Sequence, residues 1–204
     1  GEGLGNKFLA NIRETDAIVH VVRCFDNDNI IHVEGSCDPA RDIAIIDLEL
    51  VMADLEMVER RIDKAKKAAK GDKKFLQEAA DFEGLRDWLN DGKSARSYEE
   101  VDIAAEYPDC ELLSLKPVIY AANLDEDGFS DPESVGYYCQ VEQRAKEQGA
   151  QVIPVCAKLE AEIAELDGEE KKMFLDDLGV AESGLDRLVK ASYTLLGLIS
   201  YLTS

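Results

Sequence analysis

Two short polar segments hold the residues of this chain that are best suited to bind a ligand. Each follows a run of apolar residues, and they read Asn123-Leu124-Asp125-Glu126 and Cys156-Ala157-Lys158. An asparagine side chain can brace neighbouring loops by hydrogen bonds, and the carboxylate of Asp125 or Glu126 can accept hydrogen bonds from an exocyclic amine. The backbone N–H groups of Ala157 and Lys158 are expected to face the same crevice. Because strands often end in Asn and acidic residues at an ordinary turn, the pattern alone does not decide between a ligand site and a turn.

The apolar runs that precede these segments are typical of buried strands. They cover residues 117–122 and 151–156, and a third run of the same kind covers residues 17–23. Near-continuous runs of this length, rich in β-branched residues, favour strands buried on both faces, as in parallel sheets covered by helices. Ligands of open α/β sheets lie outside the carboxyl ends of the strands, so the two polar segments are expected to reach one ligand.

Helical patterns separate and follow these strands. Residues 132–148 form one such pattern, which ends at Gly149 in the position of a C′ residue and completes a β-α-β unit. Helices are also predicted over residues 7–13, 160–166, 168–178 and 182–198. The sequence therefore predicts an α/β fold, with a parallel sheet and helices on both of its faces.

The segment between the first and second strands follows a different pattern. Its apolar residues alternate at intervals of three and four, the spacing of a heptad seam, at Leu48, Val51, Leu55, Val58, Ile62, Ala65 and Ala69. A turn at residues 70–72 and a second helical stretch toward Gly92 favour an antiparallel helical hairpin. A long core helix has the same periodicity, but no strand-like run lies here for it to cover. We therefore expect a coiled-coil arm at 47–115, inserted between domain parts at 1–46 and 116–204.

The predicted arm carries a basic cluster in a chain that is otherwise acidic. Residues 54–74 contain eight basic and five acidic residues, and the basic ones are Arg60, Arg61, Lys64, Lys66, Lys67, Lys70, Lys73 and Lys74. Because Lys and Arg neutralise phosphates, the cluster suits docking onto an anionic partner such as ribosomal RNA. A solvated helix surface has a similar composition, and charge alone leaves both interpretations open.

Composition limits what the chain can be. Its 204 residues, 46% hydrophobic and 32% charged, fit one folded α/β domain or one domain with an insertion. The formal net charge of −20 argues against a surface that binds nucleic acid by bulk charge. No apolar stretch is long enough to span a membrane, and no basic segment followed by an apolar run marks a secretory signal. Neither a membrane nor DNA is an expected partner.

Cysteines and glycine-rich segments add no further site. The five cysteines are scattered and lack a CxxC pair, so we expect reduced thiols and neither a disulfide framework nor a zinc site. Residues 1–6 depart from G-x-G-x-x-G at the last position, and Asp87 stands where a Walker A loop ending at Ser94 needs its first glycine. No Ser-His-Asp set stands out. We therefore expect no catalytic group and no metal ligand in this chain.

Strings of residues along the whole chain resemble one known family. They include Gly1-Glu2-Gly3-Leu4-Gly5-Asn6-Lys7-Phe8-Leu9, Asp54-Leu55-Glu56-Met57-Val58-Glu59-Arg60-Arg61, Asn123-Leu124-Asp125-Glu126-Asp127-Gly128, Cys156-Ala157-Lys158-Leu159-Glu160 and Ser183-Gly184-Leu185-Asp186-Arg187-Leu188. In this order they resemble the Obg-like P-loop GTPases, and within them the YchF (Obg-like ATPase) subfamily, from the end of switch II onward. The resemblance implies a G-domain fold with an inserted coiled-coil arm.

The resemblance also implies a cytoplasmic, Mg²⁺-dependent ATPase of the translation-factor class, which associates with the ribosome through the large subunit or its RNA. By this likeness Asn123, Leu124 and Glu126 form the base site, and Cys156-Ala157-Lys158 matches the family's S-A-K loop with Cys in place of Ser. Ordinary GTPases use N-K-x-D, whose Asp accepts two hydrogen bonds from guanine. Leu124 and Glu126 stand where that Lys and Asp would be, so the resemblance implies that ATP is preferred and GTP binds more weakly.

The same resemblance implies that the chain is an internal part of a longer protein. In the family, the phosphate loop, switch I and the DxxG of switch II precede the first string, and a TGS domain follows the last. The Mg²⁺ ligands are thus expected outside this chain, and the chain alone is expected to hydrolyse no ATP at a measurable rate. An alternative from a different class is a non-catalytic module that binds the ribosome or a protein partner through its arm.

Overall fold

The structure, a computed structural model, describes residues 2–26 and 37–198. The chain divides into two compact units, one containing residues 1–16 and 44–116 and the other containing residues 17–43 and 117–204. We call them the helical unit and the sheet unit. The predicted arm lies wholly within the helical unit, which residues 1–16 also join. As domain boundaries, residues 46 and 116 stay a prediction.

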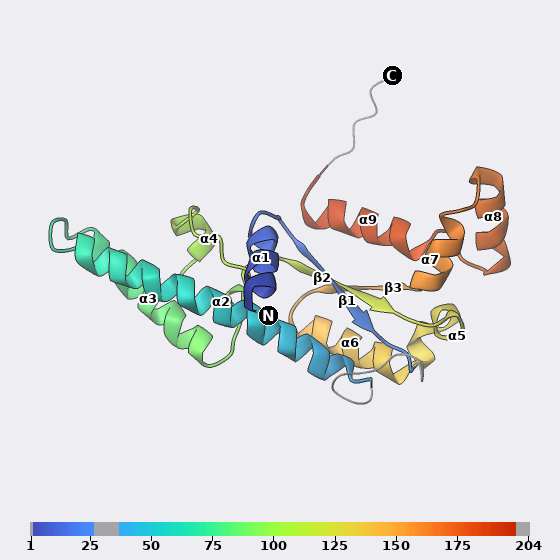
Figure 1. Ribbon diagram of the computed structural model, residues 1–204, viewed down its shortest axis with the longest axis horizontal. Helices are drawn as coiled ribbons and strands as arrows, with labels where there is room; N and C mark the ends of the chain where they lie inside the picture. The colour runs from blue at the N-terminus through green and yellow to red at the C-terminus, as the bar shows by residue number, and fades with distance from the viewer. Residues whose placement is uncertain (1, 27–36, 199–204) are drawn as a thin grey trace, which may run out of the picture. The chain divides into compact units, whose positions relative to one another are not determined.

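Among the described residues of the sheet unit, three parallel strands form a sheet in the order β1-β2-β3. They are β1 (Ile18–Arg23), β2 (Val118–Asn123) and β3 (Gln151–Val155), and Figure 1 shows them side by side. The predicted α/β fold with a parallel sheet is confirmed. The register aligns Arg23 with Asn123, and Asn123 with Val155. All three strands therefore end at the same edge of the sheet.

The helices of the sheet unit connect β2 to β3 and follow β3. They are α5 (Glu126–Ser130), α6 (Gly136–Glu147), α7 (Ala157–Ile163), α8 (Gly168–Asp177) and α9 (Gly184–Leu195). The predicted helix at 132–148 begins later than expected because Pro132–Ser134 forms a separate 3-10 turn. Gly149 has the positive φ of 64° expected of a C′ residue, and α9 ends before Leu198 because Gly197 adopts a φ of 62°.

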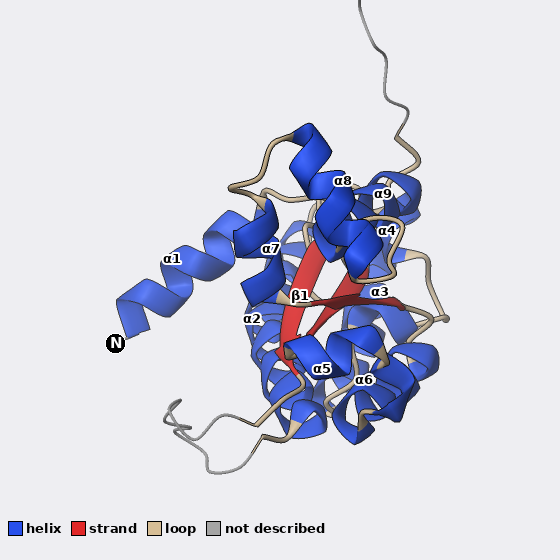
Figure 2. Cartoon of the chain, turned by 90° about the vertical axis from the view of Figure 1, so that its right-hand side faces the viewer, coloured by secondary structure: helices blue, strands red, loops and turns tan. Residues whose placement is uncertain are grey.

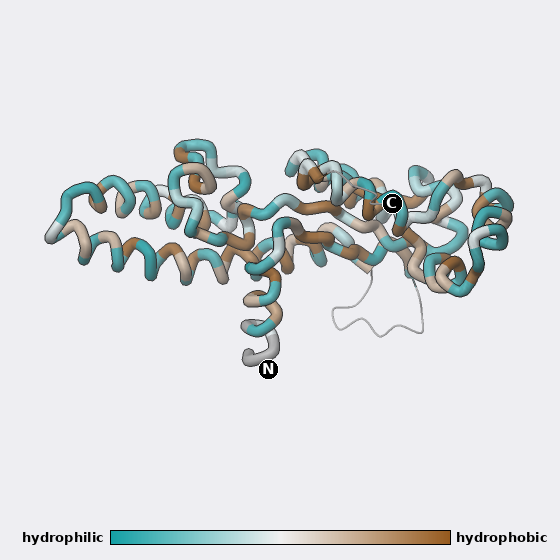
Figure 3. The backbone as a smooth tube through the Cα atoms, turned by 90° about the horizontal axis from the view of Figure 1, so that it is seen from above, coloured by the Kyte–Doolittle hydropathy of each residue, from teal (hydrophilic) through white to brown (hydrophobic). Residues whose placement is uncertain are grey.

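Helices cover both faces of the central strand. Figures 1 and 2 show α6 on one side of the sheet and α9 on the other. The residues of β2 that face α6 share a core cluster with its apolar residues, and together these are Val118, Tyr120, Ala122, Tyr138, Val141 and Ala145. Ile119 and Ala121 alternate to the opposite face and are buried as well. The strands appear in Figure 3 as hydrophobic stretches, and β2 is buried on both faces as predicted.

β1 differs from the prediction that it is buried on both faces. Val19 and Val21 are 42% and 63% exposed, whereas Val22 is buried. Alternation places Val19 and Val21 on one face of the strand. Within the described part of the sheet unit, α6 and α9 pack mainly against β2 and β3, and β1 lies at the edge of the sheet. One face of β1 is therefore open in the described structure.

The helical unit is built around a helical hairpin. Its elements are α1 (Glu2–Arg13), most of α2 (Pro39–Ala68), α3 (Phe75–Asn90), a 3-10 turn at Ala95–Ser97 and α4 (Ile103–Glu106). Figure 1 shows α2 and α3 lying antiparallel and joined by a short turn, so the predicted hairpin is confirmed. Within residues 2–26 and 37–198, no helix has both the length and the apolar character needed to cross a membrane.

Apolar packing between α2 and α3 follows most of the predicted heptad seam. The cluster that joins them contains Val51, Val58 and Ile62 of α2 together with Phe82, Leu85 and Leu89 of α3. Leu48 departs from the prediction because it is 50% exposed. Since the helices run antiparallel and α3 ends at Asn90, close to the level of Val51, the α2 turn that contains Leu48 extends past its partner helix.

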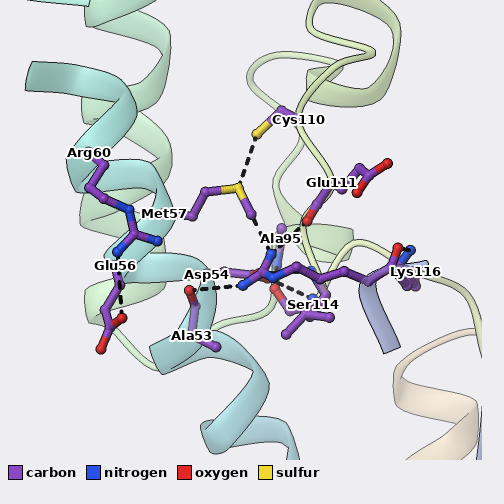
Figure 4. Close-up of polar contacts among 12 residues, drawn as sticks. Ala53, Asp54, Glu56, Met57, Arg60, Ala95, Cys110, Glu111, Ser114 and Lys116 are labelled. Atoms are coloured by element: carbon purple, nitrogen blue, oxygen red, sulfur yellow. Dashed lines mark hydrogen bonds and ion pairs between the residues drawn. The ribbon is translucent and has the colours of Figure 1, made fainter. Parts of the chain in front are cut away.

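A buried carboxylate closes the base of the hairpin (Figure 4). Asp54 of α2 is fully buried, and its oxygens accept the backbone N–H groups of Leu113 and Ser114 at 2.8 and 2.7 Å. Arg13, at the end of α1, lies 3.8 Å from this carboxylate and donates to the carbonyl of Glu111 at 2.8 Å. Burial raises the pKa of Asp54, while the two N–H groups and Arg13 oppose that rise. The carboxylate therefore holds the returning loop against α2.

Ser114 and Lys116 extend this network to the neighbouring segments. The Ser114 hydroxyl accepts the N–H of Ala95 at 3.0 Å, and its carbonyl accepts the N–H of Arg96 at 3.2 Å. The ammonium group of Lys116 donates to the carbonyl of Arg13 at 2.9 Å, one of the carbonyls that lack a partner within α1. Polar contacts thus tie α1, α2 and the returning loop together.

Replacing Asp54 with alanine should destabilise the helical unit. The change leaves the N–H groups of Leu113 and Ser114 buried without an acceptor, and each such group costs about 1–3 kcal/mol. We expect the free energy of unfolding to fall by at least about 2 kcal/mol in Asp54→Ala, measured by urea denaturation with circular dichroism. Asp63→Ala is the matched control, because Asp63 is exposed on the same helix. Equal stability of the two variants would contradict the structural role of Asp54.

Candidate functional site

Hydrogen bonds at the ends of β2 and β3 bring the two predicted polar segments together. The N–H of Leu124 donates to the carbonyl of Val155 at 2.8 Å, and the N–H of Cys24 donates to the carbonyl of Asn123 at 2.8 Å. The side-chain Oδ1 of Asn123 then accepts the N–H of Ala157 at 3.0 Å. Asn123 therefore braces the loop after β2 against the loop after β3, as the sequence predicted.

The brace also decides which groups remain for a ligand. Ala157 is the first residue of α7, so its N–H has no acceptor within the helix and Asn123 supplies one. In the structure this N–H is therefore occupied by Asn123, and the contact of Ala157 with a ligand stays a prediction. Because Oδ1 of Asn123 is occupied and Nδ2 has no partner among the described residues, Asn123 offers a ligand hydrogen-bond donors.

Leu124 and Cys156 anchor the two loops in the core of the sheet unit. Both side chains are buried and belong to the same apolar cluster as Phe129. Burial raises the pKa of the Cys156 thiol, so this group stays protonated at neutral pH. From the sequence we expect both residues at a base site, and in the structure the buried side chain of each anchors its loop to the apolar core. Their contact with a base stays a prediction.

Glu126 and Lys158 form an ion pair between the two loops. Oε2 of Glu126 lies 2.6 Å from Nζ of Lys158, and the side chains are 48% and 66% exposed. The hydrogen bond to Glu126 and its charge raise the pKa of Lys158, so the ammonium group stays charged. An exposed pair contributes little to stability, but this one sets the direction of one carboxylate oxygen. The other oxygen, Oε1, has no partner among the described residues.

Asp125 has a different role from Glu126. Its Oδ1 accepts the N–H of Gly128 at 2.8 Å and so caps the first turn of α5. A Cβ atom on Gly128 would lie 2.9 Å from that oxygen and 3.0 Å from Cγ2 of Val135, so only glycine fits without displacing the cap. Of the two carboxylates that the sequence offered as acceptors, Glu126 is the one not used in capping.

The loop after β3 has supports that the sequence patterns missed. Oε1 of Glu160 accepts the N–H of Leu185 at 3.2 Å, and Arg187 donates to the carbonyl of Pro154 at 3.4 Å. A Cβ atom on Gly184 would lie 3.0 Å from the same carbonyl, so α9 begins in close contact with β3. These contacts join residues 25 or more positions apart, and the only signal for them is the likeness of the 156–160 and 183–188 strings to the family.

One member of the predicted docking cluster on the arm is a structural residue. The Arg61 guanidinium lies 2.5 Å from the carboxylates of both Glu78 and Asp109, and its side chain is only 20% exposed. It also stacks over the ring of Phe82 at 5.3 Å. Arg61 therefore joins α2 to α3 and to the loop at Asp109, and we leave it out of the docking surface proposed below.

The other seven cations of the cluster are exposed but not equally free. Three have acidic partners, namely Lys66 with Glu83, Lys74 with Asp72 and Arg60 with Glu56. The charge of Lys64 helps to lower the pKa of Asp109. Lys67, Lys70 and Lys73 form no ion pair within 4 Å in the part of the chain that the structure describes. The last three are thus the cations most available to a partner.

Comparison with known proteins finds relatives that are similar to this chain in sequence. A scan against protein-family models finds no match. The chain is 50% identical over 206 residues to the ribosome-binding ATPase YchF of Bacillus subtilis (strain 168), and 48% identical over 208 residues to the protein of that name from Escherichia coli O157:H7. Both alignments cover 100% of this chain. The chain is homologous to YchF over its whole length.

A solved YchF structure has the same fold. The YchF GTPase of Schizosaccharomyces pombe matches 100% of this chain with a TM-score of 0.85 and 33% sequence identity. This match supports the Obg-like P-loop assignment and the α/β fold drawn from the residues. The chain spans 56% of the length of each of these YchF proteins. The bacterial YchF proteins are named ATPases and the S. pombe protein a GTPase, so the names leave the purine preference open.

Replacing Asn123 should release the loop that follows β3. In Asn123→Ala the N–H of Ala157 loses its acceptor, and one hydrogen bond of this kind is worth about 1 kcal/mol. We expect hydrogen exchange at the Ala157 amide to speed up by at least about fivefold, measured by NMR. Asn123→Asp keeps an oxygen at the same place and should preserve the protection. Unchanged exchange in Asn123→Ala would show that the brace is not formed in solution.

Proposed function

We propose that the protein containing this chain is a cytoplasmic P-loop ATPase that prefers ATP to GTP, requires Mg²⁺ and associates with the ribosome. Homology to YchF along the whole chain supports this class. The observation that carries the proposal within the chain is the bond between Oδ1 of Asn123 and the N–H of Ala157. It joins two polar loops at the carboxyl edge of a parallel sheet, where open α/β sheets bind their ligands.

Asn123 suits the recognition of a purine ring. Because its oxygen is committed to Ala157, its Nδ2 group is left to donate a hydrogen bond. N7 is an acceptor in both adenine and guanine. A bond from Nδ2 to N7 therefore positions either purine without choosing between them.

The choice between the purines then depends on the residues beside Asn123. Guanine presents two neighbouring donors, N1–H and the N2 amine, whereas adenine presents one donor at N6 beside an acceptor at N1. The Asp of ordinary GTPases accepts both guanine donors. Glu126 stands in its place with a longer side chain and an ion pair to Lys158, and the buried Leu124 brings no charge to this edge. These differences favour adenine.

The phosphate chemistry of such an enzyme is not part of what we propose for this chain. The described residues contain no group of three or more His, Cys, Asp or Glu side chains that could hold a metal ion. Phosphoryl transfer in P-loop proteins needs a phosphate-binding Lys and Mg²⁺, and we assign neither to residues of this chain. The contribution that we propose for the chain is the recognition of the base.

Calorimetric titration of the protein at the full length of its YchF relatives tests the proposal. ATP and GTP are titrated separately in the presence of Mg²⁺, with CTP as a control that lacks the purine N7. We expect ATP to bind at least about tenfold more tightly than GTP, a difference of about 1.4 kcal/mol, and CTP to bind more weakly than either. Equal affinities, or tighter binding of GTP, would overturn the adenine assignment and leave the fold unaffected.

We also propose a second function, in which Lys67, Lys70 and Lys73 dock the arm onto an anionic surface such as the RNA of the large ribosomal subunit. These lysines are exposed and unpaired among the described residues, in a chain with a formal net charge of −20. A local cluster can neutralise phosphates and release counterions even where the total charge is negative. The same contact would serve the alternative in which the chain acts as a non-catalytic binding module.

Reversing these three charges should weaken ribosome binding. We expect the Lys67→Glu, Lys70→Glu, Lys73→Glu variant to lose at least about tenfold in affinity and to show a weaker salt dependence, measured by co-sedimentation at several salt concentrations. The matched control carries Lys7→Glu, Lys146→Glu and Lys172→Glu, which change the net charge equally at exposed positions outside the arm. An equal loss of ribosome affinity in both variants would show that net charge causes the effect, and it would refute docking through the arm.

A further inference from the structure

The ion pair at the base site leaves the Glu126 carboxylate with two unequal oxygens. Oε2 accepts a hydrogen bond from the ammonium group of Lys158 at 2.6 Å, while Oε1 has no partner among the described residues. Lys158 follows directly after Ala157, whose N–H is held by Asn123. The backbone that carries Lys158 is therefore tied to the end of β2, on the same side of the sheet as Glu126.

The number of free oxygens matters for the choice of purine. A carboxylate with both oxygens free can accept the two adjacent donors of guanine in a bidentate manner. A carboxylate with one oxygen held by an ammonium group presents its other oxygen as the acceptor without a competing partner, and adenine presents one donor on the corresponding edge. To accept both guanine donors, Glu126 would have to share Oε2 with Lys158 or turn away from it.

We propose that Lys158 is a specificity-determining residue, which disfavours guanine by occupying Oε2 of Glu126 and leaving Oε1 as the single acceptor for adenine. This inference rests on the proposed function, since it assumes that these loops contact a purine base. Lys158 acts through Glu126 and is in that sense a positioning residue. It needs no contact of its own with the nucleotide.

The charges around the pair favour this arrangement. Glu162 lies close enough to add to the rise in the pKa of Lys158, and Asp125 and Glu126 act together on the nearby Cys156 thiol. The edge of the sheet is thus rich in carboxylates, and Lys158 is the cation that pairs with Glu126.

The test measures the ratio of ATP to GTP affinity in the full-length protein and its variants by calorimetry with Mg²⁺. Lys158→Ala frees the second oxygen, so GTP affinity relative to ATP should rise by about tenfold, the effect of one charge-assisted hydrogen bond. Lys172→Ala removes an equal charge at an exposed position away from the loops and should leave the ratio unchanged.

A double-mutant cycle with Glu126→Gln separates this role from a general loss of structure. Glutamine has one acceptor oxygen and no charge, so removal of Lys158 cannot create a bidentate carboxylate and should not raise GTP affinity relative to ATP in that background. A ratio that stays at the wild-type value in Lys158→Ala alone would overturn the inference, as would an equal shift in both backgrounds. Failure of the proposed function is distinct, because the unmodified protein itself would then show no preference for ATP.

Discussion

Parallel pairing of β2 with both β1 and β3 is the constraint on which the rest of the structure depends. Parallel strands cannot be joined by a tight turn, so each pair needs a crossover connection. Between β2 and β3 the crossover is the short path through α5 and α6, and between β1 and β2 it contains the whole helical hairpin. The same pairing brings the carboxyl ends of the strands to one edge, which is why Asn123 can reach the N–H of Ala157.

The long crossover is stable only if its own ends are held together. Apolar packing between α2 and α3 provides most of this, but the loop that returns toward β2 has backbone groups that need partners away from water. Asp54 supplies two acceptor oxygens at that point, and Arg13 and Ser114 extend the contact to α1 and to Ala95. A polar network therefore completes a unit whose core is otherwise apolar.

The two proposed binding surfaces use charge in opposite ways. At the edge of the sheet, Glu126 and Lys158 form an ion pair, and we propose that selectivity comes from how the carboxylate oxygens are presented to the base. On the arm, Lys67 and Lys70 keep their charge unpaired among the described residues, so attraction to phosphates dominates there. A strongly acidic chain can combine both because these interactions act over short distances and are screened by salt beyond them.

The sequence by itself determined the kind and order of the strands and of the longer helices, because the local periodicity of apolar residues reports whether a segment is a helix or a strand. The short helices α4 and α5 were not predicted. Its likeness to YchF also pointed to the two loops of the candidate site. Only the tertiary structure decided which charged residues meet. Arg61 resembled the other cations of the arm until Glu78 and Asp109 packed against it. Glu126 resembled a free acceptor until Lys158, 32 positions further along, was brought to it. Such pairings depend on the packing of distant segments, which no local pattern of residues encodes.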